Sequence, residues 1–99
     1  MTAYIVFERD STEDQQALDR YAAHADSTFE GHDVTVLVDY GPREVLEGPA
    51  IEGVVVLQFP DRESAKKWYF SDAYQKAAQH RFRGATYRAV LVDGVAEQA

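Results

Sequence analysis

The pattern of hydrophobic and polar positions predicts four principal β-strands. Val34–Tyr40 alternates between two faces, with three valines and a tyrosine on one of them. Val54–Phe59 is the most apolar segment and contains three β-branched residues. Ala3–Phe7 and Tyr87–Val92 are the other two predicted strands, and Arg43–Leu46 is expected to add a short extended piece. Gly-Pro and Asp-Gly pairs punctuate these segments as turns.

A first helix is predicted between the first two strands. Its apolar side chains recur every three or four residues: Leu18, Ala22, Ala25 and Phe29. This spacing predicts one buried helical stripe. Ser11 or Thr12 is expected to cap the start of the helix, and Gly31 to end it.

A second helical segment follows the third strand. Asp61 is the expected cap, and a second cap at Ser71 predicts a break inside the segment. The buried stripe is expected to continue inward toward Phe82, and Gly84 to end the helix. The small and aromatic residues of this stripe are Ala65, Trp68, Tyr69, Ala73, Ala77 and Ala78.

The element order β-α-β-β-α-β predicts a ferredoxin-like sandwich of the α+β class. In this fold two helices cover one face of an antiparallel sheet, and right-handed crossovers leave few alternatives. Residues 1–99 are expected to form one domain of this kind.

The strands are apolar on both faces, although two helices can cover only one of them. Ile5 and Phe7 alternate with Tyr4 and Val6, whereas a sheet with one wet face usually alternates with polar residues. A second apolar face in water would form a large exposed patch. We therefore expect two copies to pack sheet against sheet, as a homodimeric α/β barrel.

Composition and charge narrow the class of protein. The 99 residues are 45% hydrophobic and contain no cysteine, which excludes disulfides and thiolate metal sites. Ten basic against 17 acidic residues leave a net charge of −7. This balance disfavours nucleic acid and anionic membranes as partners. No apolar run is long enough to span a bilayer, so a cytoplasmic location is expected.

Several motifs together resemble one known family, over nearly the whole chain. They are Ala3-Tyr4-Ile5-Val6, Glu44-Val45-Leu46-Glu47-Gly48, Leu57-Gln58-Phe59-Pro60, Ala65-Lys66-Lys67-Trp68-Tyr69, Ser71-Asp72-Ala73-Tyr74-Gln75, Arg81 and Val90-Leu91-Val92-Asp93-Gly94. The resemblance is to domain-of-unknown-function family 1330, in the dimeric α/β-barrel superfamily. It implies a ferredoxin-like protomer and a homodimer. Relatives in the superfamily include cofactor-free monooxygenases, lactone isomerases and polyketide cyclases, which work in a pocket between sheet and helices. Gly31-His32-Asp33 departs from the Gly-Gly pair that is usual before the second strand.

Five residues on or beside the second helical segment are candidates for substrate binding. Tyr74 and Arg81 are seven residues apart and share a helical face. Arg81 would hold a carboxylate or enolate, and Tyr74 would offer its hydroxyl to the same ligand. Trp68, Tyr69 and Ser71 complete the predicted wall. The alternative is structural, with the aromatics in the core, Ser71 as a cap, and Arg81 in a salt bridge or on helix-end carbonyls.

Glu47, His32 and His80 are the candidates for catalytic acid–base chemistry. Histidines titrate near neutrality, and Glu47 is the expected carboxylate partner of Arg81. The alternative is that Glu47 and His80 are exposed surface residues and His32 belongs to a loop. No metal-ligand motif is present, so we expect no metal site and no bound cofactor.

Two functions remain open from the sequence. The first is a homodimer that binds a small molecule and acts as a cofactor-independent enzyme on an aromatic or carbonyl substrate, by isomerase, cyclase or monooxygenase chemistry. The second is a non-catalytic binding or structural dimer of unassigned role. A cavity lined by Tyr74, Arg81 and Glu47 would favour the enzyme, and a closely packed interior would favour the alternative.

Overall fold

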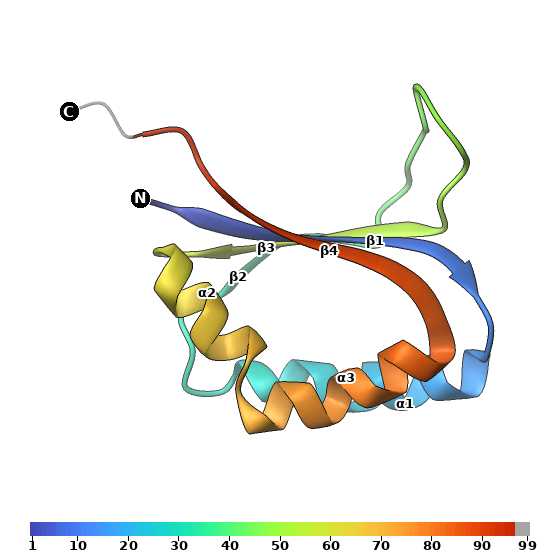
Figure 1. Cartoon of the computed structure of the whole chain (residues 1–99), viewed down its shortest axis with the longest axis horizontal. Coiled ribbons are helices and arrows are strands. Elements are labelled where there is room, and N and C mark those ends of the chain that lie inside the picture. The colour runs from blue at the N-terminus through green and yellow to red at the C-terminus, as the bar shows by residue number, and fades with distance from the viewer. Residues whose placement is uncertain (97–99) are drawn as a thin grey trace.

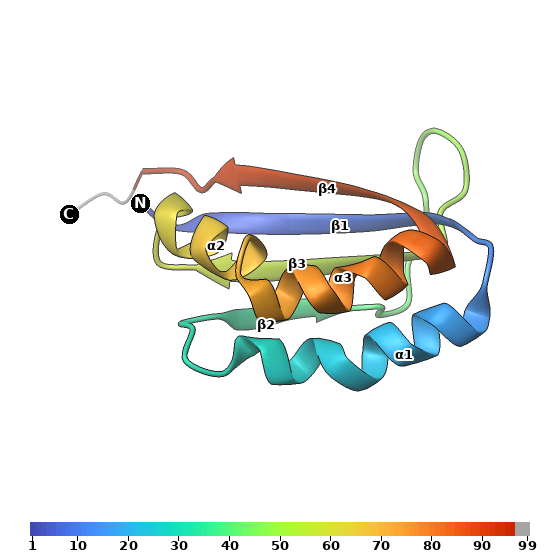
Figure 2. The same ribbon diagram turned by 60° about the horizontal axis from the view of Figure 1, so that its bottom comes forward.

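The computed structural model describes residues 1–96 and has the predicted ferredoxin-like architecture (Figure 1). The elements in chain order are β1 (Ala3–Thr12), α1 (Gln15–Ala25), the 3₁₀ helix η1 (Asp26–Phe29), β2 (Thr35–Asp39), β3 (Gly53–Phe59), α2 (Arg62–Tyr69), α3 (Asp72–Gly84) and β4 (Ala85–Asp93). The strands form one antiparallel sheet in the order β2-β3-β1-β4. All the helices cover the same face of this sheet (Figure 2).

The first strand is longer than predicted, and this moves the helix cap. β1 pairs with β4 past an irregularity after Arg9 and reaches Thr12. Thr12 is therefore a strand residue, and its hydroxyl donates to Glu52. The cap of α1 is Asp14, whose carboxylate accepts the backbone N–H groups of Gln16 and Ala17. The prediction of a cap at Ser11 or Thr12 was wrong because strand pairing continues through both residues.

The segment between β2 and β3 is a loop without a strand. The predicted extended piece at Arg43–Leu46 lies inside it and pairs with no strand. Arg43 instead closes the loop by donating from Nε to the carbonyl of Ile51. The loop rises on the side of the sheet away from the helices (Figure 1). Gly31 has a φ of +80°, as expected for a residue that ends a helix, and follows η1.

The caps of α2 and α3 are confirmed at Asp61 and Ser71. Ser71 Oγ accepts the backbone N–H of Tyr74 and donates to the carbonyl of Trp68, which separates the two helices. Gly84 ends α3 as predicted, and a Cβ there would lie 2.7 Å from a methyl carbon of Leu18.

The buried stripe of α3 differs from the prediction at two positions. Ala73 is exposed, and Phe82 is 51% exposed rather than inward. The buried positions follow a three- or four-residue spacing that begins one residue later: Tyr74, Ala77, Ala78 and Arg81. The start of the helix after the Ser71 cap sets this rotation.

The two faces of the sheet have different environments. The helix-facing side contributes Ile5, Phe7, Leu57 and Phe59 to the core. We call the opposite side the outer face; no helix of residues 1–96 covers it, and the strand register assigns its apolar residues. They are Tyr4, Val6, Val38, Val54, Val56, Val90 and Val92. None of these seven is buried in the protomer.

Candidate functional site

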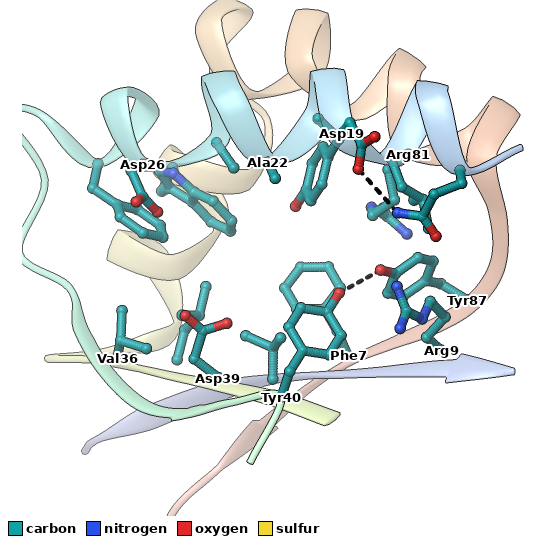
Figure 3. A pocket seen from close by; sticks show the side chains of 18 residues that line it. Phe7, Arg9, Asp19, Ala22, Asp26, Val36, Asp39, Tyr40, Arg81 and Tyr87 are labelled. Atoms are coloured by element: carbon teal, nitrogen blue, oxygen red, sulfur yellow. Dashed lines mark hydrogen bonds between the residues drawn. The ribbon is translucent and has the colours of Figure 1, made fainter. Parts of the chain in front are cut away.

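A cavity of about 290 Å³ lies between α1 and the helix-facing side of the sheet (Figure 3). Helix α1 contributes Leu18 and Tyr21, and the sheet contributes Phe7 and Tyr87. Arg81 reaches the cavity from α3. A pocket of this size, with aromatic walls and a few polar groups, is typical of sites for small organic ligands.

Arg81 is the least ordinary residue of the cavity, because it is charged and only 4% exposed. Its guanidinium carbon lies 4.8–5.1 Å from the ring centres of Phe7, Phe82 and Tyr87. Among residues 1–96 its Nε has no hydrogen-bond partner, and no carboxylate lies within ion-pair distance of it. A buried cation without a carboxylate is expensive, so this arrangement indicates a place for an anionic group from outside the chain.

The environment of Arg81 keeps it charged. Burial disfavours the charged guanidinium, but the neighbouring hydroxyls of Tyr74 and Tyr21 outweigh burial and raise the pKa of Arg81. The cavity therefore presents a fixed positive charge at all physiological pH values.

Tyr21 and Tyr74 form a hydroxyl pair beside this charge. Their oxygens are 2.9 Å apart, and their rings meet edge to face. Burial raises the pKa of both residues, so both hydroxyls stay protonated at neutral pH. Tyr74 is fully buried, whereas Tyr21 lines the cavity.

Either hydroxyl of this pair can donate to the other. When Tyr74 is the donor, the proton of Tyr21, which lines the cavity, is available to a ligand. The arrangement offers a ligand oxygen one cation and one neutral donor, which suits a carboxylate, a carbonyl or an enolate.

The structure places the five predicted binding residues in different roles. Trp68 lines the cavity and is also core, with Nε1 donating to Thr28 at 3.1 Å. Tyr74 and Arg81 share the buried face of α3 as predicted, but only Arg81 lines the cavity, so Tyr74 is not placed to offer its hydroxyl to a ligand. Tyr69 packs against Trp68 and Tyr74 but does not line the cavity, and Ser71 is the cap of α3.

The three predicted catalytic residues are not brought to the cavity. Glu47 is exposed on the loop that rises from the other side of the sheet, so it is not the partner of Arg81. His32 lies in the turn after η1, where its backbone N–H donates to Phe29. His80 stacks on His24 across the contact between α3 and α1. The expectation for Glu47 was wrong because no local pattern indicates the side from which this loop leaves the sheet.

Several cavity residues carried no functional assignment from sequence reasoning: Tyr21, Arg9, Tyr40, Tyr87 and Asp39. The alternation of side chains along the strands could have assigned two of them, Arg9 and Tyr87, to the helix-facing side. Arg9 continues the helix-facing series of Ile5 and Phe7, and Tyr87 is its partner in β4. The signal was missed because the first strand was expected to end at Phe7.

The fold and the cavity define a class: ferredoxin-like α+β proteins with a pocket between sheet and helices. The chain belongs to the family described as domain of unknown function DUF1330, whose sequence profile matches residues 2–95. None of the helices in residues 1–96 is long and apolar enough to cross a membrane. No functionally curated protein is similar enough in sequence to be matched to this chain.

Solved structures share the fold at low sequence identity. A protein of unknown function from Rhodopseudomonas palustris is similar with a TM-score of 0.72 and 15% identity, over 97% of this chain and 84% of that one. SnoaB, a cofactor-independent oxygenase from Streptomyces nogalater, is similar with a TM-score of 0.57 and 12% identity, over 99% and 94%. A dimeric protein of unknown function and ferredoxin-like fold from Bacteroides fragilis gives 0.52 and 10%, over 94% and 96%.

Proposed function

We propose that the protein is a homodimer that binds a small aromatic or carbonyl compound in the cavity of each protomer, through an anionic oxygen held by Arg81. The observation that carries the proposal is the burial of Arg81, 4% exposed and without a carboxylate partner among residues 1–96, in the wall of a 290 Å³ cavity. The aromatic lining of Trp68, Phe7 and Tyr87 favours a flat, unsaturated ligand.

The outer face supports the homodimer. Its seven apolar residues come from all four strands and form a continuous surface, with Val38 and Val90 still 39% and 44% exposed. Such a surface is rarely left in water, and a two-fold partner covers it with the same surface. One structural neighbour is described as dimeric. We expect the interface to bury at least about 1,200 Å² in total.

The donor set also supports catalysis without a cofactor. Arg81 and the hydroxyl of Tyr21, which lines the cavity, would stabilise negative charge on a ligand oxygen, which is the requirement of isomerisation, cyclisation and oxygenation through an enolate. Asp39 lines the same cavity from the end of β2 and is the carboxylate that we assign as proton acceptor. The neighbour SnoaB is described as a cofactor-independent oxygenase.

One observation favours a second candidate, a dimer that binds the ligand without transforming it. His32, His80 and Glu47 all lie outside the cavity, which leaves only aspartates as bases among its lining residues in the described part of the chain. Turnover that survives Asp39→Asn, with binding intact, would mean that Asp39 is not the base.

The proposal is tested by binding of a matched pair of probes, 2-naphthoate and its uncharged amide. In isothermal titration calorimetry we expect the acid to bind and Arg81→Met to weaken it at least ~tenfold, equivalent to ~1.4 kcal/mol. Arg83→Met is the control, because Arg83 is an exposed arginine on the same helix. Equal affinity of the acid for the Arg81→Met and wild-type proteins would overturn the proposal, as would equal affinity of the wild-type protein for acid and amide.

A further inference from the structure

Two arginines of the cavity share an unusual feature. Residues 1–96 contain three buried side-chain nitrogen or oxygen atoms without a hydrogen-bond partner, and two of them are the Nε atoms of Arg9 and Arg81. Both side chains line the same cavity. The third atom belongs to His80, outside it. Unpartnered buried donors are rare in folded proteins, so their concentration at one cavity points to groups that a ligand supplies.

Arg9 is only partly satisfied by the protein. Its Nε lies 3.4 Å from Oε1 of Glu52, close enough for an ion pair but not aligned as a hydrogen bond. The same oxygen of Glu52 already accepts the hydroxyl proton of Thr12 at 2.6 Å. The guanidinium carbon lies 5.0 Å from the ring centre of Tyr40. Arg9 is therefore held in place while retaining a donor for another group.

A second tyrosine pair lies between the two arginines. The hydroxyls of Tyr40 and Tyr87 are hydrogen-bonded to each other. Arg9 stacks on Tyr40, and Arg81 stacks on Tyr87. Two hydroxyls hold two protons and their mutual bond uses one, so one O–H remains free to donate. Figure 3 shows Arg9, Tyr87 and Arg81 gathered at one end of the cavity, away from Asp26 and Val36.

Tyr40 is held in a strained backbone conformation, and its ring fills space that only a glycine at position 53 leaves open. Its backbone has a φ of +56°, a conformation that is costly for an aromatic residue. Its ring occupies the space in front of Gly53, where any Cβ would overlap it. Strain of this kind persists where surrounding contacts fix the residue, and it is concentrated at ligand sites. Tyr40 is also 39% exposed, so core packing alone does not account for it.

We propose that Arg9 and the Tyr40–Tyr87 pair form a second polar contact point of the cavity, and that the ligand carries a second oxygen function besides the group held by Arg81. The ligand class is thus an aromatic or unsaturated acid, or an enolisable carbonyl compound, with an additional hydroxyl, carbonyl or carboxylate. This inference rests on the proposed function, because both contact points belong to one ligand.

The test adds one oxygen to the probe and removes the donors one group at a time. The affinity of the wild-type protein is measured by calorimetry for 2-naphthoate, 3-hydroxy-2-naphthoate and 6-hydroxy-2-naphthoate. We expect at least one hydroxy acid to bind about fivefold tighter than 2-naphthoate, the gain from one net hydrogen bond. Tyr40→Phe/Tyr87→Phe, which keeps both rings, should remove this gain, measured as the ratio of that variant's own affinities for the hydroxy acid and for 2-naphthoate.

Arg9→Met is the second variant, and it tests the cation separately from the hydroxyls. It should also remove the gain, whereas Arg43→Met, on the exposed loop, should retain it. Thermal melting of each variant reports whether the fold is intact.

The outcomes separate this inference from the proposed function. Binding of 2-naphthoate with no gain from either hydroxyl position overturns the second contact point alone, and so does a gain that survives in both variants. Failure of all three acids to bind overturns the proposed function together with the inference.

Discussion

The two faces of the sheet carry apolar residues of different kinds. The helix-facing side holds large side chains such as Phe7, Leu57 and Phe59, each at most 3% exposed, and it is interrupted by donors that lack partners. The outer face carries six valines and Tyr4, and the strand register adds the polar residues Glu8, Thr35, Gln58 and Arg88. None of the unpartnered buried atoms found in residues 1–96 belongs to it. A face with unsatisfied buried donors is suited to a ligand, and a face of branched apolar residues is suited to another copy of itself.

The outer face should respond most strongly to a buried charge. Val56 lies at its centre, in register with Val6 and Val38. Val56→Lys would place an unpaired ammonium in the interface and weaken the dimer more than about 100-fold, because burying such a charge costs several kcal/mol. Sedimentation at micromolar concentration measures this. Glu63→Lys, on the exposed side of α2, is the control and should remain dimeric.

The contact between α1 and α3, on the side of the sheet that the helices cover, should respond to added volume instead. In Gly84→Ala the new methyl would lie 2.7 Å from Leu18 Cδ2 and 3.0 Å from its backbone nitrogen. We expect the free energy of unfolding to fall by about 1–3 kcal/mol, the usual cost of overpacking. Gly41→Ala has no atom within 4 Å of the added Cβ and should leave denaturant stability unchanged. Equal effects of the two changes would contradict the close contact between α1 and α3.

The indole of Trp68 tests how the polar atoms behind the cavity are satisfied. Its Nε1 donates to Thr28, whose hydroxyl donates to the carbonyl of Ala25. Thr28→Val keeps the shape and leaves the indole N–H without an acceptor, which should cost about 1–2 kcal/mol in chemical denaturation. Ser27→Ala removes an exposed hydroxyl from the same 3₁₀ helix and should cost less. A neutral Thr28→Val would mean that this hydrogen bond contributes nothing.

The smallest effect concerns alkaline pH. Burial raises the pKa of Tyr21, Tyr40 and Tyr74 above the usual value of 10. A raised pKa favours the protonated form in the folded state, so the stabilisation is complete below pH 10 and is lost as the pH rises above it. The free energy of unfolding should decline above pH 10, and the decline should be shallower in Tyr21→Phe than in Tyr4→Phe. The same slope in both variants would contradict the burial of Tyr21.

The fold was predictable from the sequence to the extent that local signals agree with tertiary contacts. Local sequence signals correctly predicted the helix caps at Asp61 and Ser71 and the end of α3 at Gly84. Thr12 has a good capping sequence, but pairing of β1 with β4 determines its conformation. The local sequence pattern carries no information about pairing with a distant strand. The predicted cap of α1 at Thr12 therefore lies two residues before the observed cap at Asp14.

For the candidate site, the sequence could predict only which residues of one helix share a face. The seven-residue spacing correctly placed Tyr74 and Arg81 on one buried face of α3, although only Arg81 lines the cavity. Tyr21, Tyr40 and Arg9 come from three other segments and meet only through the topology of the sheet and helix packing. Glu47 was assigned as the partner of Arg81 because it follows the apolar Leu46 at a turn. The direction of its loop is a tertiary property that no spacing encodes.

Native mass spectrometry of the protein purified from the organism that makes it tests the central claim most directly. The account predicts a homodimer that carries a small organic acid or enolisable compound with a second oxygen function, and the loss of this compound from Arg81→Met but not from Arg83→Met. A monomer, or the same compound retained at equal occupancy by Arg81→Met, would contradict it.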